Sequence, residues 1–322
     1  MEREKGSPKN RIAIIMLFAA GLLLLLLISA VSLGWFTNNK TVEGSEMGMT
    51  AADGIYELAA LDKGGLYDRI LSVPDGKSRN DVTLSDGTAI TLSATADGKP
   101  EIKWQMSDES NFGNLAGEGI QPGSCGRLTF YVIARKDADL DLIFTLDTVL
   151  YNNSAAENRD NSDCIIPQNE AVSKLAKGHI LFFGKYDEES GIYSERITDG
   201  FTFSQKNAKE NTAYRVDFYW VWPSFADQLI LPSGDGILRK RGYERLTANG
   251  ESVISEGEAE LFFEGGAENL AAMLENMAAG SDSPGFNEEY YNTLNAKWNS
   301  ADQLIGTSAA FIELKLTADI IK

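Results

Sequence analysis

The chain of 322 residues has a net charge of −18, with 43% hydrophobic and 24% charged residues. This composition can bury a core, whereas the acidity disfavours binding to nucleic acid or to anionic lipid surfaces. The single histidine, His179, is too few for a conventional zinc protease site, which needs two or three imidazoles, commonly in a His-Glu-x-x-His motif. We therefore expect no catalytic residue, no nucleic-acid partner, and a structural His179 at the start of a buried strand.

An uncharged apolar run at residues 12–33 follows a basic segment at residues 1–11. A helix of that length spans about 30 Å of hydrocarbon. The basic flank predicts that residues 1–11 stay in the cytoplasm, that residues 12–34 form a signal peptide or transmembrane anchor, and that residues 35–322 are exported. The chain therefore contacts the membrane through this helix if the helix is not cleaved.

Two features of the apolar run give opposite indications of whether it is cleaved. The apolar part of a secretory signal is usually only about 7–15 residues long, so the length here favours an uncleaved anchor. The small residues Ala30 and Ser32 favour cleavage between Ser32 and Leu33. Both alternatives stay open.

Alternating apolar residues predict strands through the middle of the chain. Residues 81–94 predict a hairpin around Asp86 and Gly87, a pair suited to a type I′ turn. Residues 126–151 predict a second, longer hairpin, and residues 212–222 give the strongest single strand. The residues expected on the inner faces are Leu128, Phe130 and Val132, then Leu140, Leu142, Phe144 and Leu146, then Tyr214, Val216, Phe218, Trp220 and Trp222.

Helical periodicity appears nearer the end of the chain. Residues 265–280 and 287–306 predict two amphipathic helices, the first closed by Gly280. A final strand at 309–320 must then return to the sheet. The pattern predicts a mainly β protein: one antiparallel β-sandwich domain over residues 35–322, with helical insertions around residues 224–306 and one hydrophobic helix ahead of it.

The two cysteines, Cys125 and Cys164, are exported if the predicted topology holds. Cys125 opens a strand, and Cys164 follows a polar loop at residues 152–163. An oxidising compartment permits a disulfide between them, which would stabilise the fold by about 3–4 kcal/mol. The alternative is a pair of buried thiols.

Two acidic clusters raise the question of a calcium site, because calcium prefers oxygen ligands. Neither cluster follows the EF-hand pattern, since neither has its glycine and glutamate at the required positions. Solvated turns and a solvated sheet face are the alternative. The residues concerned are Asp137, Asp139 and Asp141 in the first cluster, and Asn158, Asp160 and Asp163 in the second.

The two ends of the chain resemble a known family. AVSLGWFTNNKTVEGSEMGM, residues 30–49, resembles the export segment and mature start of the camelysin and TasA group of Gram-positive surface and biofilm-matrix proteins. WNSADQLIGTSAAFIELKLTADI, residues 298–320, resembles the closing part of related clostridial proteins. The resemblance implies a jelly-roll β-sandwich with inserted helices, exported through a dedicated signal peptidase. For TasA-like members it implies fibres in which an N-terminal strand completes the sheet of the next subunit.

We therefore expect an exported, non-enzymatic cell-surface or extracellular-matrix structural protein. Its assembly strand would contain Trp35, Phe36, Val42 and Met47. One alternative is a membrane-tethered module that binds a sugar, calcium or another surface protein. A further alternative by family analogy is a camelysin-type metallopeptidase, which the lack of imidazoles argues against.

Overall fold

The computed structural model describes residues 54–61, 78–94, 101–106, 120–152, 164–232, 244–265 and 268–321. All of these belong to one compact unit, residues 54–322. Several predicted features lie outside the described residues: the apolar helix at 12–34, the cleavage site at Ser32 and Leu33, the assembly strand with Trp35, Phe36, Val42 and Met47, and the second acidic cluster with Asn158, Asp160 and Asp163.

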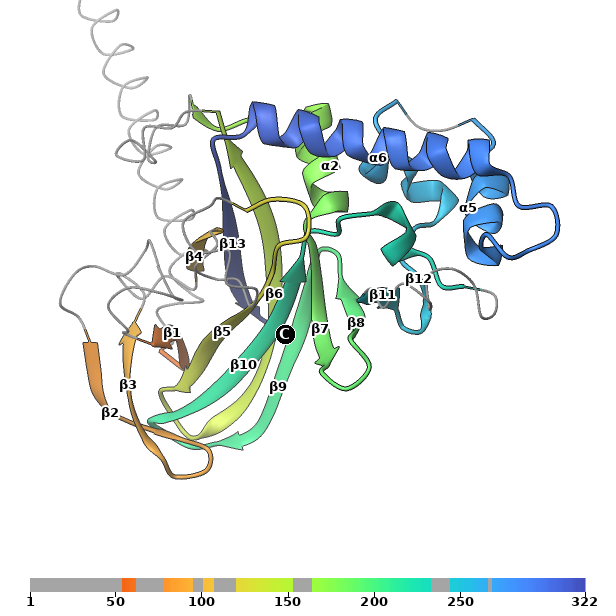
Figure 1. The fold of residues 1–322 in the computed structure, drawn as a ribbon. Coiled ribbons are helices and arrows are strands. Elements are labelled where there is room, and N and C mark those ends of the chain that lie inside the picture. Colours follow the sequence, from red (N-terminus) through yellow and green to blue (C-terminus); the bar gives the residue numbers. More distant parts are fainter. Residues whose placement is uncertain are drawn as a thin grey trace, which may run out of the picture. The chain divides into compact units, whose positions relative to one another are not determined.

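The described unit is mainly β and contains two sheets (Figure 1). The smaller sheet is antiparallel throughout, in the order β4 (Glu101–Met106), β13 (Phe311–Ile320), β6 (Ala138–Tyr151) and β9 (Gly200–Ala208). The centre of the larger sheet, also antiparallel, has the order β8 (Ile192–Ile197), β7 (Leu181–Asp187), β10 (Thr212–Val221) and β5 (Cys125–Ala134).

Short strands extend the larger sheet on both sides. Beyond β5 lie β1 (Tyr56–Leu61), β3 (Ala89–Ala94) and β2 (Ser78–Leu84), and beyond β8 lie β11 (Arg245–Ala248) and β12 (Glu251–Ser252). Strand β2 also pairs in parallel with the start of β10, so the strands β10, β5, β1, β3 and β2 form a closed ring. A small separate core, including Val82, Leu92, Tyr131 and Ile133, belongs to these strands.

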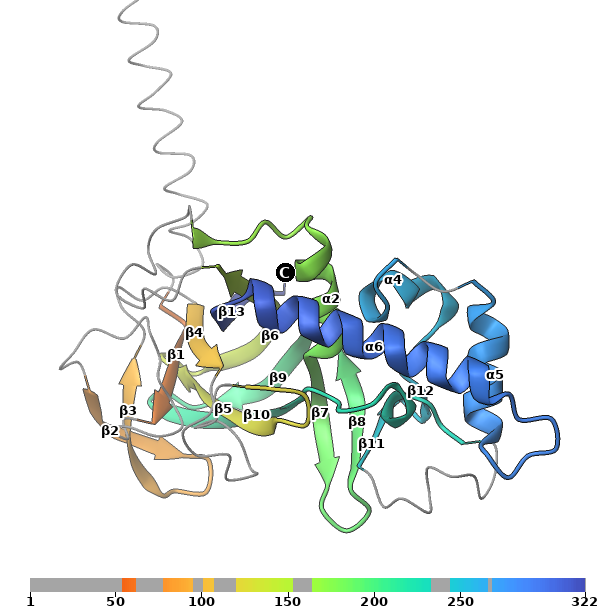
Figure 2. The same ribbon diagram turned by 45° about the horizontal axis from the view of Figure 1, so that its top comes forward.

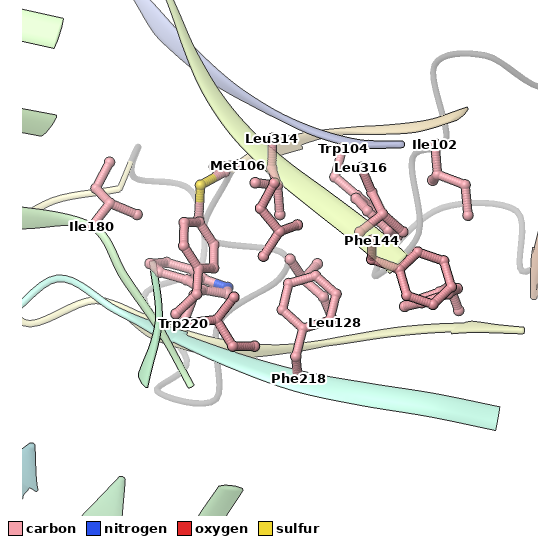
Figure 3. Close-up of a cluster of buried hydrophobic side chains, with 14 of the residues drawn as sticks. Ile102, Trp104, Met106, Leu128, Phe144, Ile180, Phe218, Trp220, Leu314 and Leu316 are labelled. Carbon is pink, nitrogen blue, oxygen red and sulfur yellow. The ribbon is translucent and has the colours of Figure 1, made fainter. Parts of the chain in front are cut away.

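The two sheets enclose a shared apolar core (Figure 3). Trp104 from β4 makes edge contacts with Phe130 from β5 and Phe218 from β10, at ring-centroid distances of 6.3 and 6.0 Å. Alternate residues of each strand point inward because successive side chains of a strand face opposite sides. The inward faces predicted for β5, β6 and β10 are confirmed.

The predicted hairpin over residues 126–151 is wrong, because β5 and β6 belong to different sheets. Strand β5 pairs with β1 and β10, whereas β6 pairs with β13 and β9. The apolar faces of the two arms meet across the sandwich instead of lying side by side. Alternation specifies which face a residue occupies but not which strand is its neighbour.

The hairpin of β2 and β3 is confirmed, but its turn differs from the prediction. A type I′ turn needs positive φ at both central residues, and here Gly87 has a φ of 86° whereas Asp86 does not have a positive φ. The Gly87 N–H donates to the Leu84 carbonyl, and the Leu84 N–H donates to the Thr88 carbonyl. These bonds define a three-residue loop, in which Asp86 instead accepts the Thr88 N–H at 2.9 Å.

The helices form a second layer on the other side of β7, β8 and the end of β10 (Figure 2). Both predicted amphipathic helices are confirmed, as α5 (Leu270–Ala279) and α6 (Glu288–Ser308). Gly280 caps α5 with a φ of 77°, and the Asn287 side chain caps α6 by accepting the N–H groups of Glu289 and Tyr290. Shorter helical turns precede them: η5 (Ala226–Leu229), η6 (Glu256–Glu258) and α4 (Ala259–Phe262).

The elements that were not predicted include the strands β1, β4, β9, β11 and β12 and the helix α2 (Ala171–His179). His179 is fully buried as expected, but it is the last residue of α2 rather than the start of a strand; β7 begins two residues later. Among the described helices, none is both long and apolar enough to cross a membrane.

Candidate functional site

A cavity of about 200 Å³ lies where the two sheets meet α2 and α4. Four segments of the chain contribute to its wall: the middle of β6, the end of α2 with the start of β7, the end of β8 with the turn before β9, and the η6–α4 region. Its lining residues are Thr145, Leu146, Asp147, Thr148, Lys177, Ile180, Leu181, Phe182, Arg196, Ile197, Thr198, Asp199, Glu258 and Leu261.

The cavity lies where β6 extends beyond its neighbour β9. The pairing of β6 with β9 ends at Thr145 and Gly200, and the last link is the Leu146 N–H, which donates to the Asp199 carbonyl at 3.1 Å. Farther along β6, the Thr148 carbonyl accepts the side-chain amide of Gln168 at 2.9 Å. Residues 145–148 of β6 therefore line the cavity at the point where the pairing with β9 ends.

Two glycines hold the walls of the cavity close together. A Cβ on Gly178 in α2 would overlap the carbonyl of Leu261 in α4, and a Cβ on Gly200 would overlap the carbonyl of Phe144 in β6. Glycine therefore allows α2 to approach α4, and the start of β9 to approach β6, more closely than any side chain would permit. Because each contact is between backbones, the spacing of these walls does not depend on flexible side chains.

Arg196 is the most confined charge in the lining, with 8% of its side chain exposed. Its guanidinium donates to the Val253 carbonyl at 3.3 Å, pairs with Glu258 at 3.3 Å and lies 5.5 Å from the centre of the Phe262 ring. These contacts tie the η6–α4 region to β8. Buried arginine is stabilised in this way because a paired, hydrogen-bonded charge avoids most of the desolvation cost.

Three other charged side chains of the lining are not engaged in this way. Within the described ranges, Asp147, Asp199 and Lys177 form no ion pair, and all three are among the residues that line the cavity. Thr145 and Thr198 add exposed hydroxyls beside them, and Thr148 adds a buried one. The cavity thus presents carboxylates, an ammonium group and hydroxyls that a ligand can reach.

A buried polar cluster lies directly behind the α2–α4 wall. His179 has no exposed surface, and its Nδ1 lies 2.6 Å from Asp302 Oδ1 while its Nε2 lies 2.9 Å from the Phe262 carbonyl. The same carboxylate oxygen accepts Trp222 Nε1–H at 2.7 Å, and the imidazole stacks on Trp298 at 3.7 Å. Helices α2, α4 and α6 and the end of β10 are joined at this point.

Oxygen atoms engage both imidazole nitrogens of His179, one from Asp302 and one from the Phe262 backbone. The indole N–H of Trp222 fixes Asp302 in turn. A side chain that is fully buried and engaged at both nitrogens cannot reach a substrate. We assign His179 and Asp302 a positioning role, holding the helices that form one wall of the cavity.

In the structure Cys125 is a half-buried thiol and Cys164 a buried one. Cys125 begins β5 opposite Val221, whereas Cys164 lies beside the end of β6, where its carbonyl accepts the Asn152 N–H at 2.9 Å. Cys125 lies near the Tyr193 phenol. The pKa of this phenol is raised above its usual value, chiefly by burial and then by the nearby Cys125 and Glu244. Cys125 therefore belongs to the core under the helices, and Cys164 to the sandwich rim.

The first acidic cluster has lysine partners. Lys206 Nζ lies 2.7 Å from Asp141 and 3.5 Å from Asp139, and Lys209 Nζ lies 2.9 Å from Asp137. In the described part of the chain, no group of three or more histidine, cysteine or acidic side chains is arranged to hold a metal ion. The cluster fits the alternative of a solvated surface better than a calcium site.

Calcium is accordingly not expected to bind this cluster, because its carboxylates already have cationic partners. Millimolar calcium should therefore leave the melting temperature of the protein unchanged. The measurement is thermal unfolding with calcium and with a chelator. A rise of several °C with calcium would contradict the assignment, since a ligand that binds only the folded state stabilises it by mass action.

The same cluster predicts a change in acid sensitivity. The Glu210 N–H, followed by Lys209, lowers the pKa of Asp137, and Lys206, followed by Ser204, lowers that of Asp141. A carboxyl whose pKa is lower in the folded state stabilises the fold above its unfolded pKa of 3.8, and this contribution is lost as the pH falls through the folded value.

Between pH 6 and pH 3, the melting temperature of the double variant D137N/D141N should therefore fall less than that of the wild type. Both groups are exposed, so the difference is expected to be small. Thr202→Ala, an exposed neutral change on β9, serves as the control. Equal acid sensitivity in all three proteins would show that these carboxylates do not contribute.

The sequence predicted neither the cavity nor the partner of His179. The lining residues come from segments up to 116 positions apart, between Thr145 and Leu261, and include no recognisable motif. The comparisons do not add a known site, since the chain matches no protein-family model, no curated protein and no solved structure.

Proposed function

We propose that this is an exported cell-surface or matrix protein whose described unit is a jelly-roll module with a structural role. The observation that carries the proposal is the apolar run at residues 12–33 ahead of a two-sheet unit. The basic flank at residues 1–11 favours export of everything that follows. The resemblance of both chain ends to the camelysin and TasA group supports the same location.

The strand order supports the jelly-roll assignment. One sheet has the order β4-β13-β6-β9 and the facing strands have the order β5-β10-β7-β8. When these eight strands are followed in chain order, each connection leads to a strand of the other sheet, except the connection within the β7–β8 hairpin. Two four-stranded sheets connected in this way are the hallmark of a jelly roll. The helices are then insertions, α2 before β7 and the others between β10 and β13.

The edges of the smaller sheet support a role in assembly. Within the described residues, β4 and β9 each pair with a strand on one side only. An extended segment of another chain adds to such an edge through main-chain hydrogen bonds. Strand β9 carries a register irregularity near its end, with Asn207 at a φ of 51°, which disfavours pairing there. The edge of β4 is therefore the better acceptor for the segment containing Trp35, Phe36, Val42 and Met47.

Fractionation of the producing cells, followed by N-terminal sequencing, tests the location. A chain that begins near residue 33 is a released subunit, and a chain that retains Met1 or Glu2 is an anchored one. Recovery of the intact chain from the cytoplasm would overturn the proposal. For assembly, deletion of residues 35–47 should abolish sedimentable polymer without changing the melting temperature of the remaining unit.

A membrane-tethered or secreted binding module is the second proposal. The cavity favours it, because Asp147, Asp199 and Lys177 line it and form no ion pair within the described ranges. A protein can combine both functions, since the cavity and the β4 edge involve different residues.

A further inference from the structure

We propose that the cavity binds a single neutral sugar residue. This inference goes beyond the structural role proposed above, because it assigns a ligand class to a site that neither assembly nor export requires. It rests on the size of the cavity, on the chemistry of its lining, and on the rigidity of its walls.

The size suits one sugar ring. Sites for drug-sized ligands usually measure about 300–1,000 Å³. A cavity of about 200 Å³ is smaller than this and accommodates one ring rather than a long oligosaccharide. The backbone contacts at Gly178 and Gly200 set the spacing of the walls before any ligand arrives, which reduces the entropy cost of binding.

The polar lining matches the hydroxyls of a sugar. Each hydroxyl donates one hydrogen bond and accepts others, so a sugar needs both acceptors and donors around it. Asp147 and Asp199 supply charged acceptors, Lys177 supplies donors, and the threonines do either. Hydrogen bonds to charged groups are stronger than those between neutral groups. Among the apolar lining residues, Leu261 is partly exposed and can contact a C–H face of the ring, whereas Leu146, Ile180, Leu181, Phe182 and Ile197 are buried behind it.

The charge balance disfavours anions and metal ions. Arg196 and Glu258 neutralise each other, which leaves Lys177 against two carboxylates. An anionic ligand would meet a net negative site. A divalent cation would be repelled by Lys177, and the described residues include no cluster of three metal-ligating side chains. A neutral hydroxyl-rich ligand uses both signs of charge without leaving either unpaired.

The test is direct binding to the purified full-length chain in a detergent without a sugar headgroup, because a glycoside detergent would compete. Saturation-transfer NMR with glucose, galactose and N-acetylglucosamine should detect at least one of them, with a Kd of about 1 mM, as expected for a ligand of this size. Putrescine, a small dication, is the contrasting probe. Binding of putrescine without any of the sugars, or binding of none of the four, would overturn the proposal.

The variant D147N/D199N should weaken sugar binding at least tenfold, and Lys177→Gln, an exposed change on α2, should weaken it as well. The matched control is Asp139→Asn, an exposed carboxylate on the same strand as Asp147 but outside the cavity. Melting temperatures confirm that each variant folds. Unchanged affinity in D147N/D199N and in Lys177→Gln would overturn the site, and cell fractionation would still report independently on the proposed function.

Discussion

Replacement of Asp302 by alanine is expected to lower the free energy of unfolding by about 3–5 kcal/mol, the usual cost of removing one partner from a buried ion pair. The carboxylate holds His179 at 2.6 Å and Trp222 at 2.7 Å through one oxygen. Its loss leaves a buried imidazole nitrogen and a buried indole N–H without their partner. Denaturant unfolding measures the change, provided that the slope of the transition is the same in both proteins.

Two comparisons separate this effect from a general disturbance of α6. Asp302→Asn keeps an oxygen acceptor of similar size but loses the charge, so it should cost less than alanine. Gln303→Ala changes the exposed neighbouring residue and should stay within about 0.5 kcal/mol of the wild type. In a double-mutant cycle, Asp302→Ala and His179→Ala should be strongly non-additive, because either change alone breaks the same pair. Additive effects would contradict the pairing.

Sequence periodicity predicted which residues face the core far better than which strands are neighbours. Leu128 to Val132 and Leu140 to Leu146 alternate in the same way whether their strands pair in one sheet or face each other in two. The connection between them spans only residues 135–137, a length that suits a hairpin as well as a crossing. Pairing with strands distant in the chain determines that β5 and β6 lie in different sheets: β5 pairs with β10, and β6 pairs with β13.

The helical layer was easier to predict because each helix carries its own apolar stripe. Leu294 and Trp298 lie on one face of α6 at a spacing of four, and both are buried. The short helix α2 also has a buried stripe at helical spacing, formed by Val172, Leu175, Ala176 and His179, but it is only nine residues long and contains Gly178. Glycine usually disfavours a helix, but Gly178 is required here because α4 approaches the backbone of α2 closely at this position.

The cavity could not be predicted because no local pattern encodes it. Asp147 and Asp199 are brought together by β6, which extends past the end of β9. Asp302 was not recognised as the partner of His179, since 123 positions separate them. A lone buried histidine does signal that some acceptor must be near, because an unpaired polar group in a core is costly.

The largest packing effect is expected for Trp104→Ala, which should destabilise the protein by about 3–5 kcal/mol. Trp104 is 2% exposed and is the central inward residue of β4, whose neighbours Ile102 and Met106 are also buried. Its ring contacts Phe130 and Phe218 from the opposite sheet. Removing it leaves a cavity between the sheets, because the backbones of β4 and β13 are fixed by their pairing over residues 101–106.

The conservative variant Trp104→Phe makes the prediction specific to packing. Among the described residues, Trp104 Nε1 has no hydrogen-bond partner, so phenylalanine removes a buried unsatisfied donor while it keeps an aromatic ring. We expect Trp104→Phe to cost less than about 1.5 kcal/mol. If β4 is the edge that accepts a neighbouring segment, Trp104→Ala should also reduce polymer formation more than its loss of stability explains, whereas Trp104→Phe should not. Equal destabilisation by the two variants would contradict the packing argument, because phenylalanine keeps an aromatic ring at this position.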